Sequence, residues 1–481
     1  MSHITVISKS VLLRIFLIIV IVIGLTGVVP RTARATAIFI VDNPADNALS
    51  GDINKGDGIC AIAAGGGCTL RAAIEEANAL FGADVITFAS SMHILLASIL
   101  PFIGDQLQID GSTVWDSAQN RPGVILDGVD KSFLYGLGIV IDSCEVYGLE
   151  IRNFQTGILI ASSLNTVGGV NGGQRNLISG NDYGIFIDGE NADGNNVLGN
   201  WIGLSASGDS KDPNEHHGVY IQNGADSNTI GGPTPNIISG NKGTGVSVFG
   251  SGSVGNTIYN NWIGLPASGD NSVGNSSAGI LVSGALNTII GIIGYGNKIA
   301  GNDGEGIQLS FASFTVVQSN EIYNNKYGVT IVSGGSNNSV LNNLIYDNQK
   351  AGSIINGGVV VRIATHNQIL NNSIFNHSTL GIDLNTGGND MLAAPTITGF
   401  DSTGIFGQAC SGCLVQVFSD AADEGKVFLG EAYADYAGSW SLLATAIGPN
   451  LTATNTDSDL NTSEFSIPYP ISNIFLPLVQ R

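Results

Sequence analysis

The segment ISGNDYGIFIDGENADGNNVLGNWIGL, residues 178–204, contains most of the pattern that decides the fold. Parts of it recur along the chain: ISGN returns at 238–241, IAGN stands at 299–302, and NWIGL returns at 261–265. The shortest recurring unit is Gly-aliphatic-x-aliphatic, represented here by Gly184-Ile-Phe-Ile. Self-similarity at intervals of roughly 20–50 residues is typical of solenoid proteins, in which each repeat packs on its neighbours.

From residue 157 onward the Gly-aliphatic-x-aliphatic unit occurs nine times, beginning at Gly157, Gly184, Gly218, Gly245, Gly279, Gly306, Gly328, Gly358 and Gly381. The shortest spacing is 22 residues, and all eighteen aliphatic positions are Ile, Val or Leu. The alternation of aliphatic residues with other residues predicts short strands whose aliphatic side chains point inward. A strand of four residues is not stable alone, so we expect stacked coils of three strands each, in a parallel β-helix of about nine or ten coils.

Composition agrees with this fold and excludes others. The 481 residues include 66 Gly and 46 Asn, and 37 of the Asn lie between Asn153 and Asn389. Both residue types are unfavourable inside helices, so a long helical protein is excluded. Only 12% of the residues are charged, and the formal net charge is −21. A phosphate backbone would be repelled, which argues against nucleic acid as a partner.

The abundance of Asn predicts an amide ladder at one corner of the coils. The candidates precede each second strand: Asn165, Asn196, Asn228, Asn256, Asn287, Asn338 and Asn367. Thr315 takes the place of Asn in the sixth unit. We therefore expect the ladder to break there.

The first 35 residues read as a secretory signal peptide. Lys9, Arg14, Arg31 and Arg34 surround the apolar run IFLIIVIVIGLTGVVP, and small-residue cleavage sites follow Ala35 and Ala37. Removing the leader leaves 14 basic (18 − 4) and 39 acidic residues, which gives a formal net charge of −25. No second long apolar run follows, so the sequence predicts export without a further membrane span. An uncleaved anchor is the alternative.

Export makes disulfides plausible for the five cysteines. Cys60 and Cys68 enclose a short Gly-rich loop, and Cys410 and Cys413 flank a Ser-Gly turn. We predict one disulfide within each pair. Cys144 has no predicted disulfide partner. We expect it to be a small buried apolar residue and not a reactive thiol.

Ahead of the repeats, TLRAAIEEANALF predicts a short helix capped by Thr69, with Leu70, Ala73, Ile74, Ala77 and Leu80 on one face. The segment DINKGDGICAIAAGGGCTLRAAIEEAN resembles the CSLREA domain, with Thr69 where Ser is usual and Ala72 where Glu is usual. The resemblance covers about residues 38–90. It implies an exported, right-handed β-helix of pectin-lyase-like fold, and this handedness agrees with the crossover rule.

The resulting domain map is a cap at 36–90, β-helix repeats at 91–390 and a small β-sandwich at 394–467. Asn becomes infrequent after Asp390, and separate predicted β segments such as CLVQVFSD and GSWSLLAT follow. This sandwich resembles bacterial Ig-like domains. The tail at 468–481 ends in IFLPLVQR and is either a sorting signal or a docked strand.

Candidate chemistry was sought at the outward positions of the repeated strands, because pectate lyases and polygalacturonases bind acidic polysaccharide along that face. Of eighteen outward residues only Asp188, Arg362 and Asp383 are charged. Asp188 is six coils from Arg362, too far to share a substrate bond. Arg362 and Asp383 lie on adjacent coils and are the catalytic candidates if the chain is an enzyme, with a surface ion pair as the alternative. Phe186 and Tyr220 are neighbours that fit a sugar-stacking role.

Metal signals are weak. The longest loop contains Glu215-His216-His217, and these residue types can bind a metal ion. No third ligand is indicated, so a solvated loop is the preferred interpretation. Asp182, Asp303 and Asp390 follow Asn at corners, where weak Ca²⁺ binding and ordinary turn geometry explain them equally well. We expect neither a bound metal nor a cofactor.

The sequence therefore predicts an all-β protein: a right-handed parallel β-helix with an N-terminal helical cap and a C-terminal β-sandwich. The function we infer is that of a non-catalytic, secreted or cell-surface scaffold for adhesion or glycan binding. The partner is a polysaccharide or cell-envelope surface, and the chain acts as a monomer. The alternative is a polysaccharide lyase or glycoside hydrolase acting on an acidic polysaccharide along the outer face.

Overall fold

The computed structural model describes residues 36–471 except 48, 64–65, 270–271 and 349–356. The predicted leader and the IFLPLVQR tail lie outside the described residues. The elements below belong to one compact unit, Ala37–Arg481. Among the residues described, no helix is long and apolar enough to cross a membrane.

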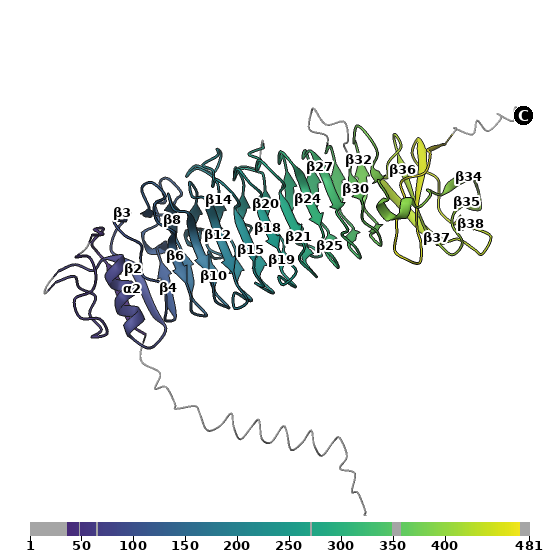
Figure 1. Cartoon of the computed structure of the whole chain (residues 1–481). Coiled ribbons are helices and arrows are strands. Elements are labelled where there is room, and N and C mark those ends of the chain that lie inside the picture. The colour runs from purple at the N-terminus through teal and green to yellow at the C-terminus, as the bar shows by residue number, and fades with distance from the viewer. Residues whose placement is uncertain (1–35, 48, 64–65, 270–271, 349–356, 472–481) are drawn as a thin grey trace, which may run out of the picture. The chain divides into compact units, whose positions relative to one another are not determined.

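Three parallel sheets make up most of the described chain, and Figure 1 shows their strands stacked coil upon coil. The first sheet contains β1 (Ile38–Val41), β2 (Asp84–Phe88), β4 (Leu107–Asp110), β7 (Glu145–Tyr147), β10 (Thr166–Val167), β13 (Asn196–Val197), β16 (Thr229–Ile230), β19 (Thr257–Ile258), β22 (Ile289–Ile290), β25 (Val316–Gln318), β28 (Ser339–Leu341) and β31 (Gln368–Leu370). The second contains β3 (Met92–Leu95), β5 (Val124–Asp127), β8 (Leu149–Arg152), β11 (Leu177–Ile178), β14 (Trp201–Ile202), β17 (Ile237–Ile238), β20 (Trp262–Ile263), β23 (Lys298–Ala300), β26 (Glu321–Tyr323), β29 (Leu344–Tyr346) and β32 (Ser373–Phe375). The third contains β6 (Tyr135–Ile139), β9 (Thr156–Ile160), β12 (Tyr183–Asp188), β15 (Val219–Gln222), β18 (Val246–Phe249), β21 (Ile280–Ser283), β24 (Glu305–Ser310), β27 (Tyr327–Val332), β30 (Val359–Arg362) and β33 (Ile382–Asn385).

The chain visits the three sheets in turn, so each circuit is one coil of a right-handed parallel β-helix. The nine repeat units form β9 to β33 of the third sheet, and β6 adds a tenth strand. The predicted fold class and coil number are therefore confirmed.

The interior is filled by the aliphatic positions of the repeat. All eighteen predicted side chains are buried, with at most 4% exposure. The repeat glycine is required by close packing between coils: a Cβ on Gly184 would lie 2.4 Å from the carbonyl oxygen of Gly218 and 2.8 Å from Ile202 Cγ2. Cys144 is also fully buried, and burial raises the pKa of its thiol to about 11.

The predicted amide ladder exists, with two of its positions corrected. Asn165 Nδ2 donates to Asn195 Oδ1 (3.0 Å), and the column continues through Asn228 and Asn256. Asn195 holds the place assigned to Asn196, which is the first residue of β13. Thr288 holds the place assigned to Asn287, because the copy LNTIIG has one more aliphatic residue before its glycine than LNTVGG.

The break in this ladder covers two coils. The buried hydroxyls of Thr288 and Thr315 have no hydrogen-bond partner, and the column resumes with Asn338 donating to Asn367 (3.0 Å). The expected break at Thr315 is thus confirmed and extends back to Thr288.

Two further ladders stand at the other corners, and the sequence analysis missed both. One runs through Asn176, Asn200, Asn236, Asn261, Asn297, Asn320, Asn343 and Asn372. The other runs through Asn181, Asn214, Asn241, Asn275, Asn302, Asn325 and Asn348. Buried amides that bond to each other across coils satisfy polar groups that would otherwise destabilise the corner.

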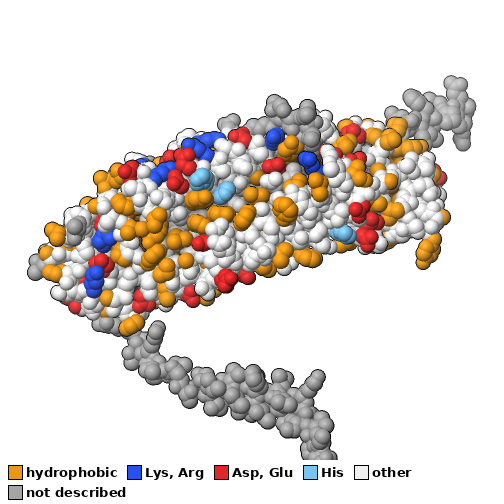
Figure 2. All heavy atoms as spheres, in the orientation of Figure 1, with side chains coloured by type: hydrophobic (Ala, Val, Ile, Leu, Met, Phe, Trp, Pro, Cys, Tyr) orange, Lys and Arg blue, Asp and Glu red, His pale blue; other side chains and the backbone are white. Residues whose placement is uncertain are grey.

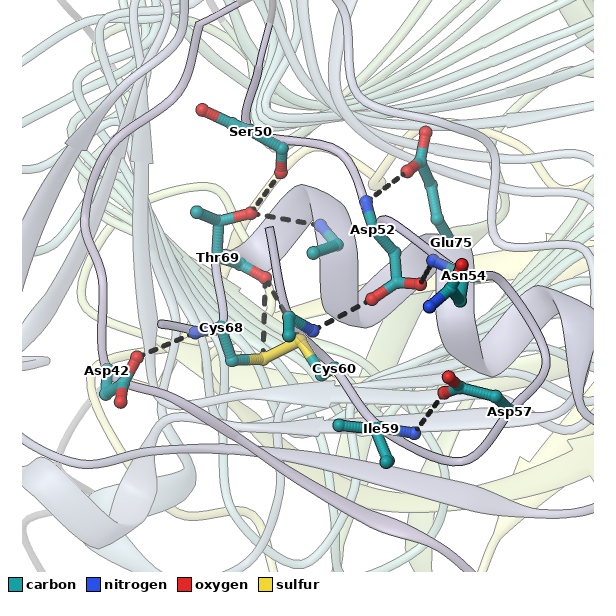
Figure 3. The surroundings of a disulfide bond; sticks show 12 residues. Asp42, Ser50, Asp52, Asn54, Asp57, Ile59, Cys60, Cys68, Thr69 and Glu75 are labelled. Carbon is teal, nitrogen blue, oxygen red and sulfur yellow. Dashed lines mark hydrogen bonds between the residues drawn. A yellow bond between two sulfur atoms is a disulfide. The ribbon is translucent and has the colours of Figure 1, made fainter. Parts of the chain in front are cut away.

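The N-terminal helix α2 (Leu70–Ala79) is the predicted one. Thr69 caps it by accepting a hydrogen bond from the Ala72 amide (3.1 Å). Its apolar face packs into the continuous core of the coils. The cap segment also supplies β1 and β2 to the first sheet. Figure 3 shows the loop before the helix, where Cys60 and Cys68 form a disulfide and Asp52 accepts hydrogen bonds from the amides of Asn54 and Ala61.

An antiparallel region follows the last coil. One sheet holds β34 (Thr396–Asp401), β35 (Gly404–Gln408) and β38 (Ser439–Leu442); the other holds β37 (Val427–Tyr433), β36 (Leu414–Asp420), β39 (Asn450–Thr456) and β40 (Tyr469–Pro470). Cys410 and Cys413 are joined by a disulfide. These sheets share a core of their own, which includes Val415, Trp440 and Leu451.

The antiparallel region covers the C-terminal ends of the amide ladders. His377 follows Asn348 in its column and is fully buried, and its Nδ1 lies 2.8 Å from Oε1 of Glu424. Gln416 Oε1 accepts a hydrogen bond from the Asn371 amide at 3.0 Å. Asn389 Nδ2 donates to the Thr462 carbonyl at 3.0 Å. Polar groups at the end of each ladder therefore find partners in the C-terminal sheets.

Candidate functional site

The outward column of the third sheet is the register that the repeat predicts. Strand pairing aligns Leu159, Phe186, Tyr220, Ser247, Leu281, Gln308, Thr330, Val360 and Asp383. Its N-terminal members are large and apolar, whereas the later ones are mostly smaller or polar. The two halves of this face therefore differ in what they offer a ligand.

Five rings gather on the N-terminal half, and we call them the aromatic stripe: Tyr183, Phe186, His216, His217 and Tyr220. Phe186 and Tyr220 stack with ring centroids 5.1 Å apart and planes at 26°. Tyr183 lies 5.6 Å from Phe186 and 5.8 Å from Tyr220. The two histidines tilt against them, with His216 4.8 Å from Tyr183 and His217 5.0 Å from Tyr220.

The sequence analysis found two of these five rings. It placed Phe186 and Tyr220 side by side, and the register agrees. It did not single out Tyr183, and it considered His216 and His217 only as metal ligands. Tyr183 and His217 each stand directly before a repeat glycine. That shared position lies three residues before the ring in the column, and strict alternation would place it on the opposite face. The register alone therefore does not reveal these two rings.

The apolar surface continues toward the N-terminus. Phe102 and Tyr135 stack with centroids 4.7 Å apart, and Phe102 lies over Gly138, the register partner of Leu159. Figure 2 shows hydrophobic side chains gathered on this part of the visible face, with histidine side chains nearby. An exposed apolar surface of this kind is typical of an interaction site.

Polar groups border the stripe on both sides. On one side Asp188 accepts hydrogen bonds from Gln222 (3.2 Å) and Asn223 (2.8 Å). On the other side Lys242 pairs with Glu215 at 2.6 Å, and Lys131 bridges Asp182 (3.1 Å) and Glu215 (3.6 Å). Glu215 is thus engaged with lysines instead of joining the two histidines as a metal ligand. In the described part of the chain, no group of three or more His, Cys, Asp or Glu is placed to hold a metal ion.

His217 is electrically neutral at physiological pH. Burial lowers the pKa of its imidazole to about 4, and the neighbouring His216 contributes in the same direction. Its Nδ1 accepts a hydrogen bond from the Thr244 amide (3.2 Å), which fixes that nitrogen in the unprotonated form. Burial, together with Tyr183 and Asp188, raises the pKa of the Tyr220 hydroxyl. His217 therefore adds no charge to the stripe, whose borders are charged.

Arg362 and Asp383 lie on adjacent strands, but in different columns. Arg362 pairs in register with Val332 and Asn385, whereas Asp383 pairs with Val360. Arg362 is exposed and lines a small cavity that does not include Asp383 among its lining residues. Burial raises the pKa of the Asp383 carboxyl. Among the described residues, no hydrogen bond or ion pair links these two side chains.

A second aromatic group lies on the outer side of the second sheet, and we call it the aromatic ladder: Tyr323, Tyr346 and Phe375. Adjacent centroids are 5.0 and 5.3 Å apart, and the planes are within 7° of parallel. Tyr346 donates a hydrogen bond to Glu321 (2.9 Å). Burial, followed by this bond, raises the pKa of the Tyr346 hydroxyl. Lys426 lies 4.5 Å from the Phe375 centroid at the end of the ladder.

A charged network on the second sheet was also missed, because its strands do not share the glycine signal. Asp127 bonds His93 (2.9 Å) and Arg152 (3.0 Å), and Glu150 pairs with Arg121 and Arg152. Burial raises the pKa of Asp127, but hydrogen bonds from Asn153, Val129 and His93 outweigh it, so the net shift is downward. A carboxylate held ionised in this way is poorly suited to general acid–base catalysis at neutral pH.

The comparisons with known proteins concern the fold. A family profile described as "Right handed beta helix region" matches residues 213–401. No curated protein matches the chain. Among solved structures, the chain is similar to the Dettilon tailspike protein (14% identity over 86% of this chain and 80% of that one, TM-score 0.43) and to ORF18 of Geobacillus virus E2 (14%, 98% and 83%, TM-score 0.47). It is also similar to pectate lyase Pel9A (15%, 74% and 79%, TM-score 0.36). The strand register and the family match together identify the chain as a right-handed parallel β-helix.

Proposed function

We propose that the protein is an exported, non-catalytic scaffold that binds a polysaccharide through the aromatic stripe. The observation that carries this proposal is the gathering of five rings on an outward face, where the two histidines tilt by 36° to 55° against the tyrosines. Tilted rings leave parts of their faces uncovered, and an apolar ring face is complementary to the C–H face of a sugar. The bordering amides and charges supply hydrogen-bond partners for sugar hydroxyls.

The aromatic ladder provides the contrast that supports this proposal. Its rings are parallel and one coil apart, so each covers the face of the next. Within its column Tyr220 has a ring neighbour, Phe186, on one side only, because the next member is Ser247. A ligand ring would continue the column beyond Tyr220, over Ser247, while Tyr183 and His217 contact Tyr220 from outside the column.

Retention on immobilised polysaccharides tests the proposal. A panel of neutral and uronic-acid polymers is used, and retention by at least one polymer is expected. Tyr220→Ala and Phe186→Ala should each weaken retention about tenfold, the effect of losing one stacking partner. Phe249→Ala is the matched control, because Phe249 is an exposed ring on the same sheet outside the stripe. Unfolding curves confirm that each variant is folded.

The outcome separates this function from its alternatives. Absence of retention across the panel, or equal losses in the Phe249→Ala control, would contradict glycan binding by the stripe. Release of oligosaccharide products that disappears in Arg362→Ala or Asp383→Ala would instead establish the lyase or hydrolase alternative. Sedimentation of the purified protein tests the proposed monomeric state.

Export is part of the same proposal. The compact unit begins at Ala37, next to the small-residue sites at Ala35 and Ala37. We expect the secreted protein to start directly after one of these alanines, and N-terminal sequencing of the protein recovered from the medium checks this. A chain that retains residues 1–35 would contradict cleavage. The CSLREA-like assignment of the cap and the Ig-like assignment of the C-terminal sheets remain proposals as well.

A further inference from the structure

The C-terminal antiparallel sheets carry a largely apolar groove of about 530 Å³. One wall comes from the end of β34 and the turn to β35, and it includes Phe400 and Asp401. The other wall is residues 443–446, which follow β38, and Leu443 in this wall is 87% exposed. The volume lies within the roughly 300–1,000 Å³ of pockets that hold drug-sized ligands, so the side chains of a short peptide segment fit it as well.

Residues 443–447 resemble a strand that lacks a partner. Exposed side chains alternate with Ala444 and Ala446, which are half-buried against the core of these sheets. None of the described strands pairs with this segment. Among the described residues, the amides of residues 445–447 donate no hydrogen bond. The segment therefore offers free donors to a strand that is added beside it.

The last described strand leads to this wall. β40 pairs antiparallel with the start of β39, and Pro470 lies opposite Asn450. The Ile471 amide continues the pairing by donating to the Pro449 carbonyl at 2.9 Å. Pro449 is three residues beyond the 443–446 wall. The chain that follows Ile471 is thus directed toward the unpaired segment.

The register of β40 predicts which residues would meet. In an antiparallel pair, each step forward on one strand is a step backward on the other. Continued from β40, the register places Ile474 opposite Ala446 and Leu476 opposite Ala444. These alanines are the half-buried members of the wall. Two aliphatic residues of the tail therefore coincide with the positions that face the core.

The tail also matches the groove in polarity. Residues 472–481, SNIFLPLVQR, carry one charge, on Arg481. The first wall contributes Phe400, whose ring meets the Tyr469 ring edge to face at 6.2 Å, and the exposed carboxylate of Asp401. An apolar segment with one positive charge complements an apolar groove with one negative charge among its lining residues.

We propose that residues 474–478 dock in this groove as an additional strand beside residues 443–447, in the register set by β40. The tail is then part of the protein's own C-terminal sheets and not a sorting signal that stays accessible. Docking covers the apolar lining of the groove and gives hydrogen-bond partners to the free amides of the wall. The proposal does not depend on glycan binding by the stripe.

Disulfide trapping in the full-length protein tests the docked register. Ala446→Cys is combined with Ile474→Cys, because opposed residues of antiparallel strands have Cα atoms about 4.5–5.5 Å apart, within the reach of a disulfide. Mild oxidation should join the two cysteines within one chain, and mass spectrometry of peptides detects the bond. The native Cys144 is fully buried and does not compete.

A shifted pair is the matched control. Ala446→Cys with Leu478→Cys uses the same wall position and the same tail, but the docked register puts the two residues four positions, or about 13 Å, apart. The in-register pair should form its disulfide about tenfold faster, the effect of a higher effective concentration. Equal rates would overturn the proposal, because a tethered tail that is not docked reaches both positions alike.

A charge in the tail tests the apolar contact. Added to the in-register pair, Leu476→Asp should slow trapping about tenfold, because it places a carboxylate against the half-buried Ala444. Gln480→Asp adds the same charge beyond the wall and should leave trapping unchanged. Unfolding curves confirm that each variant is folded. Equal losses in the two variants, or disulfides that join two chains instead of closing one, would overturn docking of the tail on its own sheets.

Discussion

The aromatic stripe and the aromatic ladder arise from the same device, a ring repeated at one register position on successive coils, yet their geometries differ. In the ladder, Tyr346 is parallel to Tyr323 and Phe375 within 7° and has a ring on each face. In the stripe, Phe186 and Tyr220 meet at 26°, and the histidines are tilted further. Stacking in a β-helix therefore does not by itself indicate a binding site; tilt and uncovered faces do.

The two groups also rest on different supports. The stripe belongs to coils whose first amide ladder is complete, with Asn195 donating to Asn228 at 2.9 Å. The aromatic ladder begins in the coil of Thr315, where that amide column is interrupted. Parallel rings on the second sheet thus occur beside the weakest part of the first ladder. We infer that the aromatic ladder stabilises the stacked coils, whereas the aromatic stripe binds a ligand.

The largest expected effect is on the middle ring of the ladder. Tyr346→Ala removes two parallel contacts and a hydrogen bond to Glu321, so we expect the free energy of unfolding to fall by about 3 kcal/mol. Tyr220→Ala removes one stacked face and should lower it by about 1.5 kcal/mol. Denaturant unfolding measures both. Loss of polymer retention in Tyr346→Ala, or an equal loss of stability in both variants, would erase the distinction.

Acidic pH should weaken the stripe. The folded pKa of His217 is about 4, below the ordinary value, so the unfolded chain binds its proton first as the pH falls. The stabilising contribution of neutral His217 is complete above about pH 6.5 and is lost as the pH falls toward 4. After allowance for partial exposure, we expect a loss of about 2 kcal/mol.

His217→Gln provides the control for this pH dependence. The variant has no imidazole at that position, so the difference between its unfolding curve and that of the parent should shrink across pH 6.5 to 4. His216, Tyr183 and Tyr220 face His217 and remain in place. A difference that stays constant with pH would show that His217 does not titrate as its burial implies. Polymer retention should fall in the same pH window.

Extending the interrupted amide column by one coil should stabilise the protein by about 1 kcal/mol, the contribution of one buried hydrogen bond. In Thr315→Asn, the new Nδ2 donates to Asn338 Oδ1, which already accepts the backbone amide of residue 315 (2.9 Å). Thr315→Val is the control, because it removes the unpartnered hydroxyl without adding an amide. If both variants gain equally, the benefit comes from deleting the hydroxyl and not from the ladder.

Much of the fold follows from the sequence because the interior of a β-helix repeats one environment. Each aliphatic position has equivalent neighbours on every coil. The pattern of residue types in one coil therefore predicts which positions are buried in all coils. The ladder register failed at Asn287 because one inserted aliphatic shifts the column by a residue without changing the motif. The ladder that begins at Asn176 was missed because it was not aligned with the repeat glycine. The ladder that begins at Asn181 could have been found, because Asn181, Asn241 and Asn302 are the last residues of the repeated ISGN and IAGN.

The site was less predictable than the fold. Phe186 and Tyr220 follow from the register alone, whereas the tilt of His217 against Tyr183 and Tyr220 depends on how the loop that ends in His217 packs. The cavity beside Arg362 depends on the small size of Thr330 and Val360 relative to their walls. Such features depend on side chains from several coils, and no single repeat encodes them.

The smallest expected effect is at the end of the ladder. Lys426 lies 4.5 Å from the Phe375 centroid, where its charge interacts with the ring that would otherwise end the stack against water. Lys426→Met keeps the aliphatic stem and the backbone carbonyl that accepts the Ser373 hydroxyl (2.6 Å), and it removes only the charge. We expect a loss of about 0.5 kcal/mol in the free energy of unfolding, the usual size of an exposed cation–π contact.

Lys326→Met is the comparison for Lys426, since the Lys326 ammonium lies 5.5 Å from the Tyr327 centroid and should contribute less. Losses of the same size in both variants would show that the contact at Phe375 has no special role. A greater loss at Lys426 means that the ladder is closed at its C-terminal end by this protein's own cation. The stripe differs at this point, because the column residue beyond Tyr220 is the small Ser247. A ring that the protein caps itself stabilises the coil, and a ring that it leaves open can receive a ligand.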